Sequence, residues 1–417
     1  MARGERVTSF DARAVRADTP MMKRVVNGRP LTYLDTASSS LPPRAVIEAI
    51  SRYYELHHAN VHRGVYTTAN EATEIYEGAR AAVAGFINAP GGADEVVFTR
   101  GTTESFNLLA KSWGAANLRE GDVVLVSEME HHANIVPWFQ LRENTGIEVR
   151  FIPVTDEYRL DLSRIDELMA GVRLLSVTGM SNVLGTVNPL DELARIAHRH
   201  GALIAVDGAQ SIAHLPTDVA ALDIDFLAFS GHKMLGPTGI GVFWTRGEIL
   251  ADMPPFLGGG GMILDVRTDG YVPASGPTRF EAGTPPIAES AGLAAAIRYL
   301  SGLGMENLAA HEHELTTDAL ARLEKEFSGR VRVIGPAEAT ARGGVLSLDV
   351  DGVHPHDVAQ ILDQYGVCVR PGHHCAKPLM RRFSLAATAR ASFGPYSLAS
   401  DTDVLIEALG EAVSLFG

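Results

Sequence analysis

The chain of 417 residues is poor in cysteine, in basic charge and in long apolar runs. Its only cysteines are Cys368 and Cys375, too few for a disulfide framework, and a reducing compartment would leave both as thiols. Lys and Arg total 36 against 50 Asp and Glu, a net charge of -14, which argues against a nucleic-acid-binding face. No apolar stretch resembles a signal peptide or reaches membrane-spanning length. We therefore expect a soluble, cytoplasmic protein with small-molecule and protein partners, and neither nucleic acid nor membrane among them.

From about residue 95 onward, short β-branched runs alternate with amphipathic stretches, a pattern typical of an α/β sheet covered on both faces by helices. The stretch 254–286 is rich in Gly and Pro and predicts long loops that pass close to a ligand or a second subunit. A connecting helix is expected at 287–300. We divide the chain into an N-terminal segment (1–30) that packs on a small domain, a large domain (31–286) and a small C-terminal domain (287–417). The predicted strands are residues 95–99, 123–126, 148–152, 173–178, 203–207, 226–229 and 241–244.

The most informative segment is a buried strand that runs into a polar turn and then a Gly/Pro loop, Asp225-Phe-Leu-Ala-Phe-Ser-Gly-His-Lys-Met-Leu-Gly-Pro-Thr-Gly239. It places Ser230, His232 and Lys233 at the carboxyl end of a strand, the edge where open α/β sheets bind ligands. A Lys held there against apolar walls can lose its proton and attack an aldehyde. The alternative is an ordinary surface lysine.

Two further strands deliver polar groups to the same edge. One ends at Asp207-Gly-Ala-Gln210, where Asp207 suits a pyridinium nitrogen and Gln210 a ring oxygen. A helix cap is the alternative for Asp207. The other leads into Gly101-Thr-Thr-Glu-Ser105, whose helical turn offers N–H groups and the hydroxyls of Thr103 and Thr102 to a phosphate. An N-cap explains the same letters.

A histidine pair and a cysteine loop complete the candidates. In Glu130-His-His-Ala-Asn134, His131 can lie flat on a ring or move protons. With His373 and His374 the pair could suggest zinc, but the spacing fits no common site, so no metal is predicted. Cys375 lies in Arg370-Pro-Gly-His-His-Cys-Ala-Lys-Pro378, whose protonatable neighbours favour the nucleophilic thiolate. Cys368, within an apolar run, is expected to be an inert filler.

Together these segments resemble the group II, or SufS-type, cysteine desulfurases of the class V aminotransferase family, which are fold-type I pyridoxal-phosphate enzymes. The resemblance spans nearly the whole chain, and SGHK followed by GPTGIG in combination with RxGHHC is its most specific part. Ser38 and Ser39 replace a more usual Ala-Thr pair, Tyr66 stands where His is frequent, and the tail at 393–396 also departs from the pattern. The matching segments are LDTA (34–37), VHRG (61–64), RGTTE (100–104), EHHANIVPW (130–138), SNVLG (181–185), DGAQ (207–210), SGHKMLGPTGIG (230–241), FEAGTP (280–285), RPGHHCAKPLM (370–380) and ARAS (389–392).

The resemblance implies a mainly parallel seven-stranded sheet in a large domain that binds pyridoxal 5'-phosphate, and a role for each candidate residue. Lys233 would carry the cofactor, His131 would stack on its ring, and Asp207 and Gln210 would contact the ring nitrogen and the ring oxygen. A homodimer is implied, because one phosphate ligand comes from the other subunit. The phosphate ligands would be Thr102, Thr103, Ser230, His232 and the partner's Thr284. Asn182 and Arg390 would receive the substrate carboxylate, and Arg370 would also bind the substrate.

The implied reaction converts L-cysteine to L-alanine and leaves a persulfide on Cys375, which a SufE-like or zinc-bearing SufU-like acceptor protein takes up. His356, at the start of a predicted helix, would be lent to the acceptor's zinc; a helix residue without a partner is the alternative. Iron–sulfur cluster assembly and a dedicated biosynthetic pathway both remain as destinations of the sulfur. Rival functions on the same fold are a selenocysteine lyase, a kynureninase-like hydrolase, an epimerase or a non-catalytic scaffold.

Overall fold

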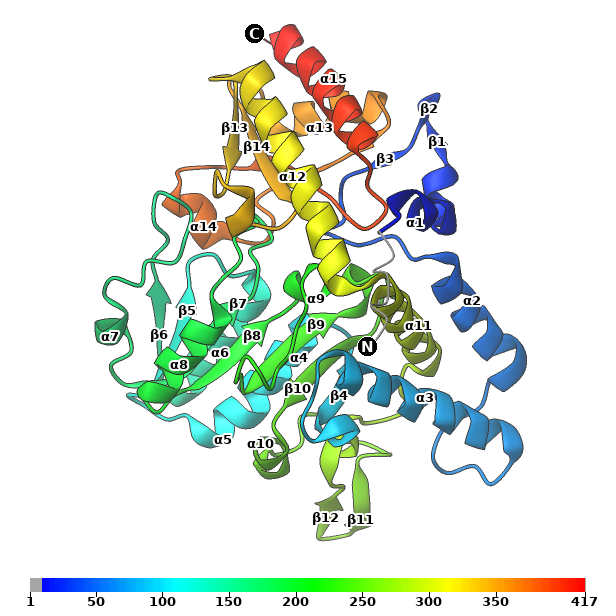
Figure 1. Cartoon of the computed structure of the whole chain (residues 1–417). Helices are drawn as coiled ribbons and strands as arrows, with labels where there is room; N and C mark the ends of the chain where they lie inside the picture. The colour runs from blue at the N-terminus through cyan, green and yellow to red at the C-terminus, as the bar shows by residue number, and fades with distance from the viewer. Residues whose placement is uncertain (1–9, 417) are drawn as a thin grey trace, which may run out of the picture.

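The computed structural model describes residues 10–416, and its larger part is built on a seven-stranded sheet with the order β4-β10-β9-β8-β7-β5-β6 (Figure 1). Only β10 is antiparallel to its neighbours; the other pairs in the sheet are parallel. All seven strands were predicted from the sequence to within one residue at each end. The strands are β4 (Val96–Thr99), β5 (Val123–Ser127), β6 (Glu148–Ile152), β7 (Val172–Thr178), β8 (Leu203–Asp207), β9 (Phe226–Ser230) and β10 (Gly241–Thr245).

Helices cover both faces of this sheet, which explains why its strands are nearly continuous apolar runs. Alternate strand residues enter two separate core clusters: Val123 and Leu125 pack on one side, Val124 and Val126 on the other. One face carries α3 (Thr67–Phe86), α8 (Leu190–Arg199) and α11 (Ile287–Leu303), and the other carries α4 (Thr102–Leu109) and α6 (Val136–Thr145). Shorter helices complete this part: α2 (Arg44–Arg52), α5 (Ala115–Asn117), α7 (Ile165–Leu168), α9 (Ser211–His214) and α10 (Gly247–Asp252).

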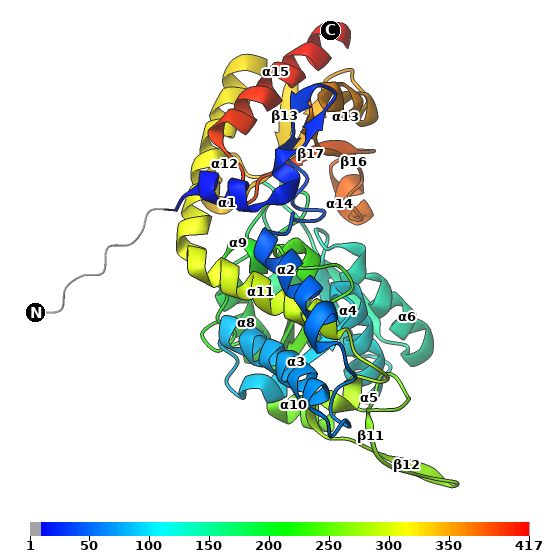
Figure 2. The ribbon, with the colours of Figure 1, turned by 90° about the vertical axis from the view of Figure 1, so that its right-hand side faces the viewer.

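A second, antiparallel sheet of four strands, with the order β13-β14-β17-β16, has its own hydrophobic core. The long helix α12 (Met305–Phe327) leads from the first part of the molecule to this second part (Figure 2). The strands are β13 (Val331–Ile334), β14 (Val345–Val350), β16 (Arg370–Gly372) and β17 (Thr388–Ser392); the accompanying helices are α13 (Pro355–Gln364), α14 (Lys377–Arg382) and α15 (Ala399–Phe416).

The N-terminal elements contact both parts of the molecule: Val15 and Met22 belong to the core cluster of the first part, and polar contacts join the segment to the second sheet unit. These elements are α1 (Ala12–Asp18), the short pair β1 (Val25–Val26) and β2 (Arg29–Pro30), and β3 (Thr32–Tyr33), which pairs in parallel with β15 (Val367–Cys368). Arg16 forms an ion pair of 2.7 Å with Asp401, and Asn27 donates a hydrogen bond of 2.6 Å to the carbonyl of Asp363. Residues 1–9 of the predicted N-terminal segment lie outside the described residues, and the two boundaries between the three predicted segments stay a prediction.

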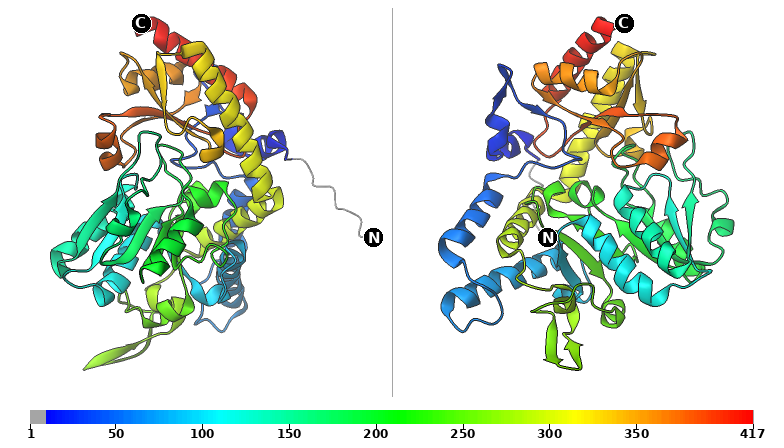
Figure 3. Two further views of the ribbon diagram at one scale, coloured as in Figure 1. Left: turned by 60° about the vertical axis from the view of Figure 1, so that its left-hand side comes forward. Right: turned by 180° about the vertical axis from the view of Figure 1, so that it is seen from behind.

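The expectation of loops alone across 254–286 was wrong. A two-stranded hairpin, β11 (Ile263–Arg267) and β12 (Gly270–Pro273), extends away from the body of the molecule (Figure 3). The run Ile-Leu-Asp-Val-Arg followed by Asp269-Gly270 is a hairpin signal that the surrounding Gly and Pro residues concealed. Between residues 10 and 416, no helix is both long and apolar enough to cross a membrane.

Candidate active site

A cavity of 330 Å³ lies at the carboxyl ends of β7, β8 and β9, the edge at which the sequence predicted ligand binding. It gathers side chains from segments far apart in the chain, including the second sheet unit. Two predicted site residues, Thr284 and His356, are not in its lining. The predicted residues that line it are Thr102, Thr103, His131, Asn182, Asp207, Gln210, Ser230, His232, Lys233, Arg370, Cys375 and Arg390.

A lysine and an aspartate occupy the buried end of this cavity. Lys233 closes a single 3-10 turn that follows β9, and burial lowers its pKa although Asp207 acts in the opposite direction. Asp207 is the last residue of β8 and is 3% exposed; its Oδ1 accepts a hydrogen bond of 2.9 Å from the N–H of Ala209. Burial raises the pKa of Asp207. A buried amine with a lowered pKa is the form in which lysine attacks a carbonyl carbon.

The N-terminus of α4 is fixed beside this pair by Ser230. Its Oγ accepts a hydrogen bond of 2.9 Å from the N–H of Thr102 and lies 2.8 Å from the hydroxyl of Thr102. The turn fits tightly on β10, since a Cβ at Gly241 would lie 2.4 Å from the Cα of Gly101. The free N–H groups of a first helical turn suit an anion such as phosphate. Burial, with Lys233 nearby, lowers the pKa of His232 to about 4, so this side chain is neutral.

The His131 ring lines the cavity in its neutral form. Burial, with smaller contributions from Lys233 and other cations, lowers its pKa to about 3, and its Nδ1 accepts a hydrogen bond of 3.1 Å from the N–H of Ala133. The preceding Glu130, to which the sequence analysis gave no role, is fully buried. Burial raises the pKa of Glu130 to about 8, and its two carboxyl oxygens accept hydrogen bonds from the N–H of Thr178 and the amide of Asn134, at 3.0 and 2.7 Å. Glu130 thereby anchors the turn that carries His131 to β7.

Cys375 is exposed and lies on a strained loop between β16 and α14. His374 and Cys375 both have left-handed backbone conformations, with φ of 51° and 55°, which costs roughly 1–2 kcal/mol per residue. Two hydrogen bonds hold this conformation: Asn182 Nδ2 donates to the His374 carbonyl at 2.8 Å, and the N–H of His132 donates to the Cys375 carbonyl at 2.7 Å. Asn182 thus contacts the cysteine loop, and its role as a substrate ligand stays a prediction.

Two arginines line the cavity near this loop. Arg390, on β17, is 2% exposed, donates a hydrogen bond of 2.9 Å to the Asn182 carbonyl, and has its pKa lowered to about 10 by burial. Arg370, on β16, is more exposed and forms an ion pair of 2.7 Å with Asp35. Asp35 and the adjacent Ser38 were not predicted as site residues. Asp35 lies within the LDTA motif and Ser38 follows it directly, and this position was the signal that could have identified them as site residues.

Thr284 and His356 lie elsewhere on the surface. Thr284 is exposed and lines a separate hollow of 440 Å³ together with residues 60–63. His356 is exposed at the start of α13, where its N–H donates to Nδ1 of His354 at 3.3 Å. Their predicted roles both involve another protein chain, so the position of each residue in one chain does not test them.

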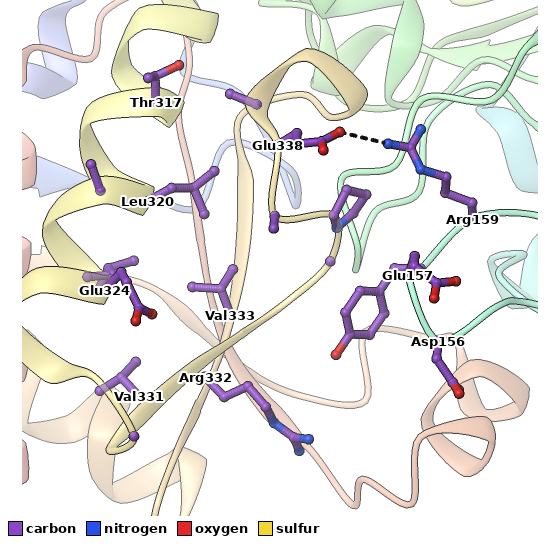
Figure 4. A pocket seen from close by; sticks show the side chains of 18 residues that line it. Asp156, Glu157, Arg159, Thr317, Leu320, Glu324, Val331, Arg332, Val333 and Glu338 are labelled. Atoms are coloured by element: carbon purple, nitrogen blue, oxygen red, sulfur yellow. Dashed lines mark hydrogen bonds and ion pairs between the residues drawn. The ribbon is translucent and has the colours of Figure 1, made fainter.

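A larger hollow of 1070 Å³ lies between the loop 156–159 and the elements α12 and β13 (Figure 4). Arg159 and Glu338 form an ion pair of 3.2 Å across it. None of its lining residues, all within the part of the chain that the structure describes, is a predicted site residue. The lining also lacks a lysine, a histidine or a cysteine, so this hollow does not offer the chemistry of the cavity around Lys233.

Comparison with known proteins places this fold and site in one class. The aminotransferase class-V family matches residues 32–405, and the chain belongs to this family. A probable cysteine desulfurase of Streptomyces coelicolor is 48% identical over 98% of both chains. The solved cysteine desulfurase CsdA of Escherichia coli, in its S-sulfonic acid form, has a TM-score of 0.90 at 38% identity and covers 98% of this chain and 100% of its own. The apo structure of a cysteine desulfurase from Thermococcus onnurineus has a TM-score of 0.91 at 40% identity and covers 96% of this chain and 98% of its own.

These matches confirm the predicted family, the α/β fold class and the predicted enzyme class, a pyridoxal-phosphate-dependent cysteine desulfurase. The cavity itself fits the cofactor. Lys233 supplies a buried amine and Asp207 a buried carboxylate, and the buried Oε1 of Gln210 has no hydrogen-bond partner among the described residues. An unpaired buried polar atom is costly unless a ligand satisfies it. The group II subtype and the individual residue roles stay predictions.

Proposed function

We propose that the chain is a group II cysteine desulfurase that converts L-cysteine to L-alanine and collects the sulfur on Cys375. The observation that carries this proposal is that one cavity is lined by an amine whose pKa is lowered by desolvation, Lys233, and by an exposed thiol, Cys375. An amine alone fits many enzymes of the family. The added thiol fits an enzyme that must accept sulfur, and it favours this function over an epimerase, a kynureninase-like hydrolase or a non-catalytic scaffold.

Pyridoxal phosphate, when bound, supplies an aldehyde that an amine can join and a ring that accepts electrons. Lys233 would hold it covalently, and Asp207 and Gln210 would contact its ring nitrogen and ring oxygen. The ring face would lie against His131. Thr102, Thr103, Ser230 and His232 would hold its phosphate. The lowered pKa of Lys233 suits its amine to take the proton from the substrate Cα once substrate has displaced it from the cofactor.

Arg390, Arg370 and Asn182 would bind the carboxylate of L-cysteine, which a planar guanidinium pairs with well. Cys375 would take the substrate sulfur. In the balanced reaction the Cβ–S bond of L-cysteine breaks, an S–S bond forms on Cys375, and the thiol proton of the enzyme ends on L-alanine. The products are one L-alanine and one enzyme persulfide, without a net oxidant or reductant.

The test is a single turnover with L-cysteine in which L-alanine and protein persulfide are both measured. The parent should form one of each per active site. Cys375→Ser should form no persulfide, whereas the matched control Cys368→Ser should behave as the parent, because Cys368 is not in the cavity lining. Persulfide of undiminished amount in Cys375→Ser would reject this function. A selenocysteine lyase instead predicts turnover of selenocysteine and none of cysteine.

The proposed active form is a homodimer, in which Thr284 joins the phosphate ligands of the neighbouring subunit. The exposed hairpin supports this proposal, because Leu264 and Val266 are 72% and 60% exposed and Tyr271 is 57% exposed. Apolar side chains gathered on one projecting hairpin are typical of a surface that another chain covers. Sedimentation of the holoenzyme should give twice the chain mass, and a stable monomer with full activity would reject the dimer.

The sulfur acceptor is proposed to be a SufU-like or SufE-like protein that supplies iron–sulfur cluster assembly in the cytoplasm. The exposure of Cys375 and of His356 supports direct contact of both with a partner. With a zinc-bearing SufU-like acceptor, His356→Ala should keep the basal turnover and lose most of the stimulation, whereas His313→Ala, a change on another helix, should lose none. Equal stimulation of His356→Ala and the parent would favour a SufE-like route.

A further inference from the structure

Two side chains to which neither the predicted roles nor the proposed reaction assigns a task lie between the two arginines of the cavity. Asp35 has a side chain only 12% exposed and directly faces Arg370, whose Nη2 donates to Oδ2 at 2.7 Å and whose Nε lies 3.2 Å from both carboxylate oxygens. The hydroxyl of Ser38 donates to Asp35 Oδ1 at 2.6 Å and accepts from Arg390 Nη2 at 2.5 Å. Ser38 itself lines the cavity.

Some of the N–H groups of Arg390 are hydrogen-bonded in this arrangement and others are not. Its Nη1 is engaged by the Asn182 carbonyl and its Nη2 by Ser38, whereas its buried Nε has no hydrogen-bond partner among the described residues. Direct contact between Asp35 Oδ1 and Arg390 Nη2 is longer, at 3.5 Å, so the Ser38 hydroxyl lies between them as a relay. These two bonds hold the guanidinium in one orientation and leave Nε as its one nitrogen without a hydrogen-bond partner among the described residues.

The positive charges of Arg370 and Arg390 explain why a hydroxyl between Asp35 and Arg390 is useful. Arg370 and Arg390 repel each other, and burial already disfavours the cation of Arg390. The Asp35 carboxylate offsets both effects, but it leaves only the more exposed Arg370 fully paired. Asp35 lies 3.5 Å from Arg390 and also reaches it through the neutral Ser38 hydroxyl, so Arg390 is paired less closely than Arg370 and its positive charge remains available to a second carboxylate.

We propose that Ser38 and Asp35 are positioning residues for the substrate carboxylate: Asp35 pairs with Arg370, and the Ser38 hydroxyl fixes Arg390 so that it presents its unpartnered Nε to the carboxylate of the amino acid. This inference rests on the proposed function and extends it to residues outside the predicted set.

The test separates binding from chemistry in the holoenzyme. Ser38→Ala should raise KM for L-cysteine about tenfold, the effect of losing one charge-assisted hydrogen bond, and leave kcat within about twofold. The affinity for L-alanine, which shares the carboxylate and lacks sulfur, should fall by the same factor in calorimetry. Ser38→Thr keeps the hydroxyl and should restore both values. The matched control is Ser163→Ala at an exposed loop position, which should change neither.

The variant Asp35→Asn tests whether Asp35 positions the arginines or competes with the substrate carboxylate. If Asp35 positions the arginines, this variant should raise KM by at least as much as Ser38→Ala. A lowered KM would show that Asp35 competes with the substrate carboxylate and would overturn the proposal, as would a Ser38→Ala variant with unchanged KM and unchanged affinity for L-alanine. A parent enzyme that forms no L-alanine from L-cysteine would instead reject the proposed function, so the two failures are distinct.

Discussion

A buried arginine on α3 provides the sharpest test of the structure outside the cavity. Arg80 is 3% exposed and pairs with two carboxylates of unequal exposure. Its Nη1 and Nη2 donate to the two oxygens of Glu281 at 2.6 and 2.8 Å, and its Nε donates to Glu77 at 2.9 Å. The side chain of Glu281 is 8% exposed and that of Glu77 is 43% exposed. Glu281 also accepts hydrogen bonds of 2.7 Å from the N–H of Phe98 and from the hydroxyl of Tyr76.

Because Glu281 and Glu77 differ in exposure, replacing each of them by Gln should lower the free energy of unfolding by different amounts. Removing the charge of one partner from a buried pair leaves the other cation buried and costs about 3–5 kcal/mol. A half-exposed pair contributes roughly 0–1 kcal/mol. Glu281→Gln retains the size of the side chain and a carbonyl oxygen, so no cavity is added to its cost. We therefore expect Glu281→Gln to be destabilising by at least ~2 kcal/mol more than Glu77→Gln.

Urea unfolding followed by tryptophan fluorescence measures this difference. The three tryptophans, Trp113, Trp138 and Trp244, are all buried in the core clusters of the seven-stranded sheet, so the signal reports on the unit that contains Arg80. The two variants should share the slope of the parent and differ in midpoint. If their free energies of unfolding agree within ~1 kcal/mol, the Arg80–Glu281 pair does not have the buried geometry described here.

The other predictions concern the cavity, the dimer and one buried histidine. Lys233→Ala should abolish the visible absorbance of the bound cofactor; a borohydride-reducible adduct in that variant would contradict the assignment. Asp207→Ala should remain folded by circular dichroism but exchange the Cα proton of L-alanine far more slowly than the parent in deuterium NMR, because the ring nitrogen loses its anionic partner. Mixed chains of Lys233→Ala and Thr284→Ala should regain activity above either variant alone if sites are shared; a heterodimer without that gain would contradict the shared site. Burial alone would lower the pKa of His214, but the Glu312 carboxylate 2.8 Å away raises it above 6.5. Stability from this pair should be complete below pH 6.5 and fall as pH rises through the raised pKa, and Glu312→Gln should remove that slope in urea midpoints.

The sheet could be predicted from the sequence because its strands are buried on both faces. Burial on both faces leaves short apolar runs with sharp ends, and the residues after those ends, such as Asp207 and Lys233, then fall at one edge by topology alone. The hairpin at 263–273 escaped prediction for the opposite reason. Its side chains are largely exposed, so it lacks the buried pattern by which strands are found, and the Gly/Pro composition around it indicated loops.

The site residues that the sequence did not reveal are those whose role depends on which side chains they contact in the folded chain, not on their position at the end of a strand. Glu130 and Asp35 are acidic residues that any loop could contain, and nothing in the local pattern says that one anchors the His131 turn or that the other faces Arg370. The arginine partners of Asp35 are more than 300 positions away in the chain. Such a pair becomes visible only once the folded chain brings Asp35 beside β16 and β17.

The cavity is divided between the two sheet units, and this division has a chemical consequence. The seven-stranded sheet contributes the buried end, where Lys233 and Asp207 are removed from water and an amine can stay unprotonated. The second unit contributes Arg390 from β17 and, on the loop after β16, the exposed Cys375. In the proposed reaction, a proton would be moved at the buried end while the exposed thiol would remain open to an acceptor protein. Because Asn182, from the first unit, holds the cysteine loop through the His374 carbonyl, the thiol has a fixed place on the exposed side of the cavity, and an acceptor of the proposed kind would have to approach it there.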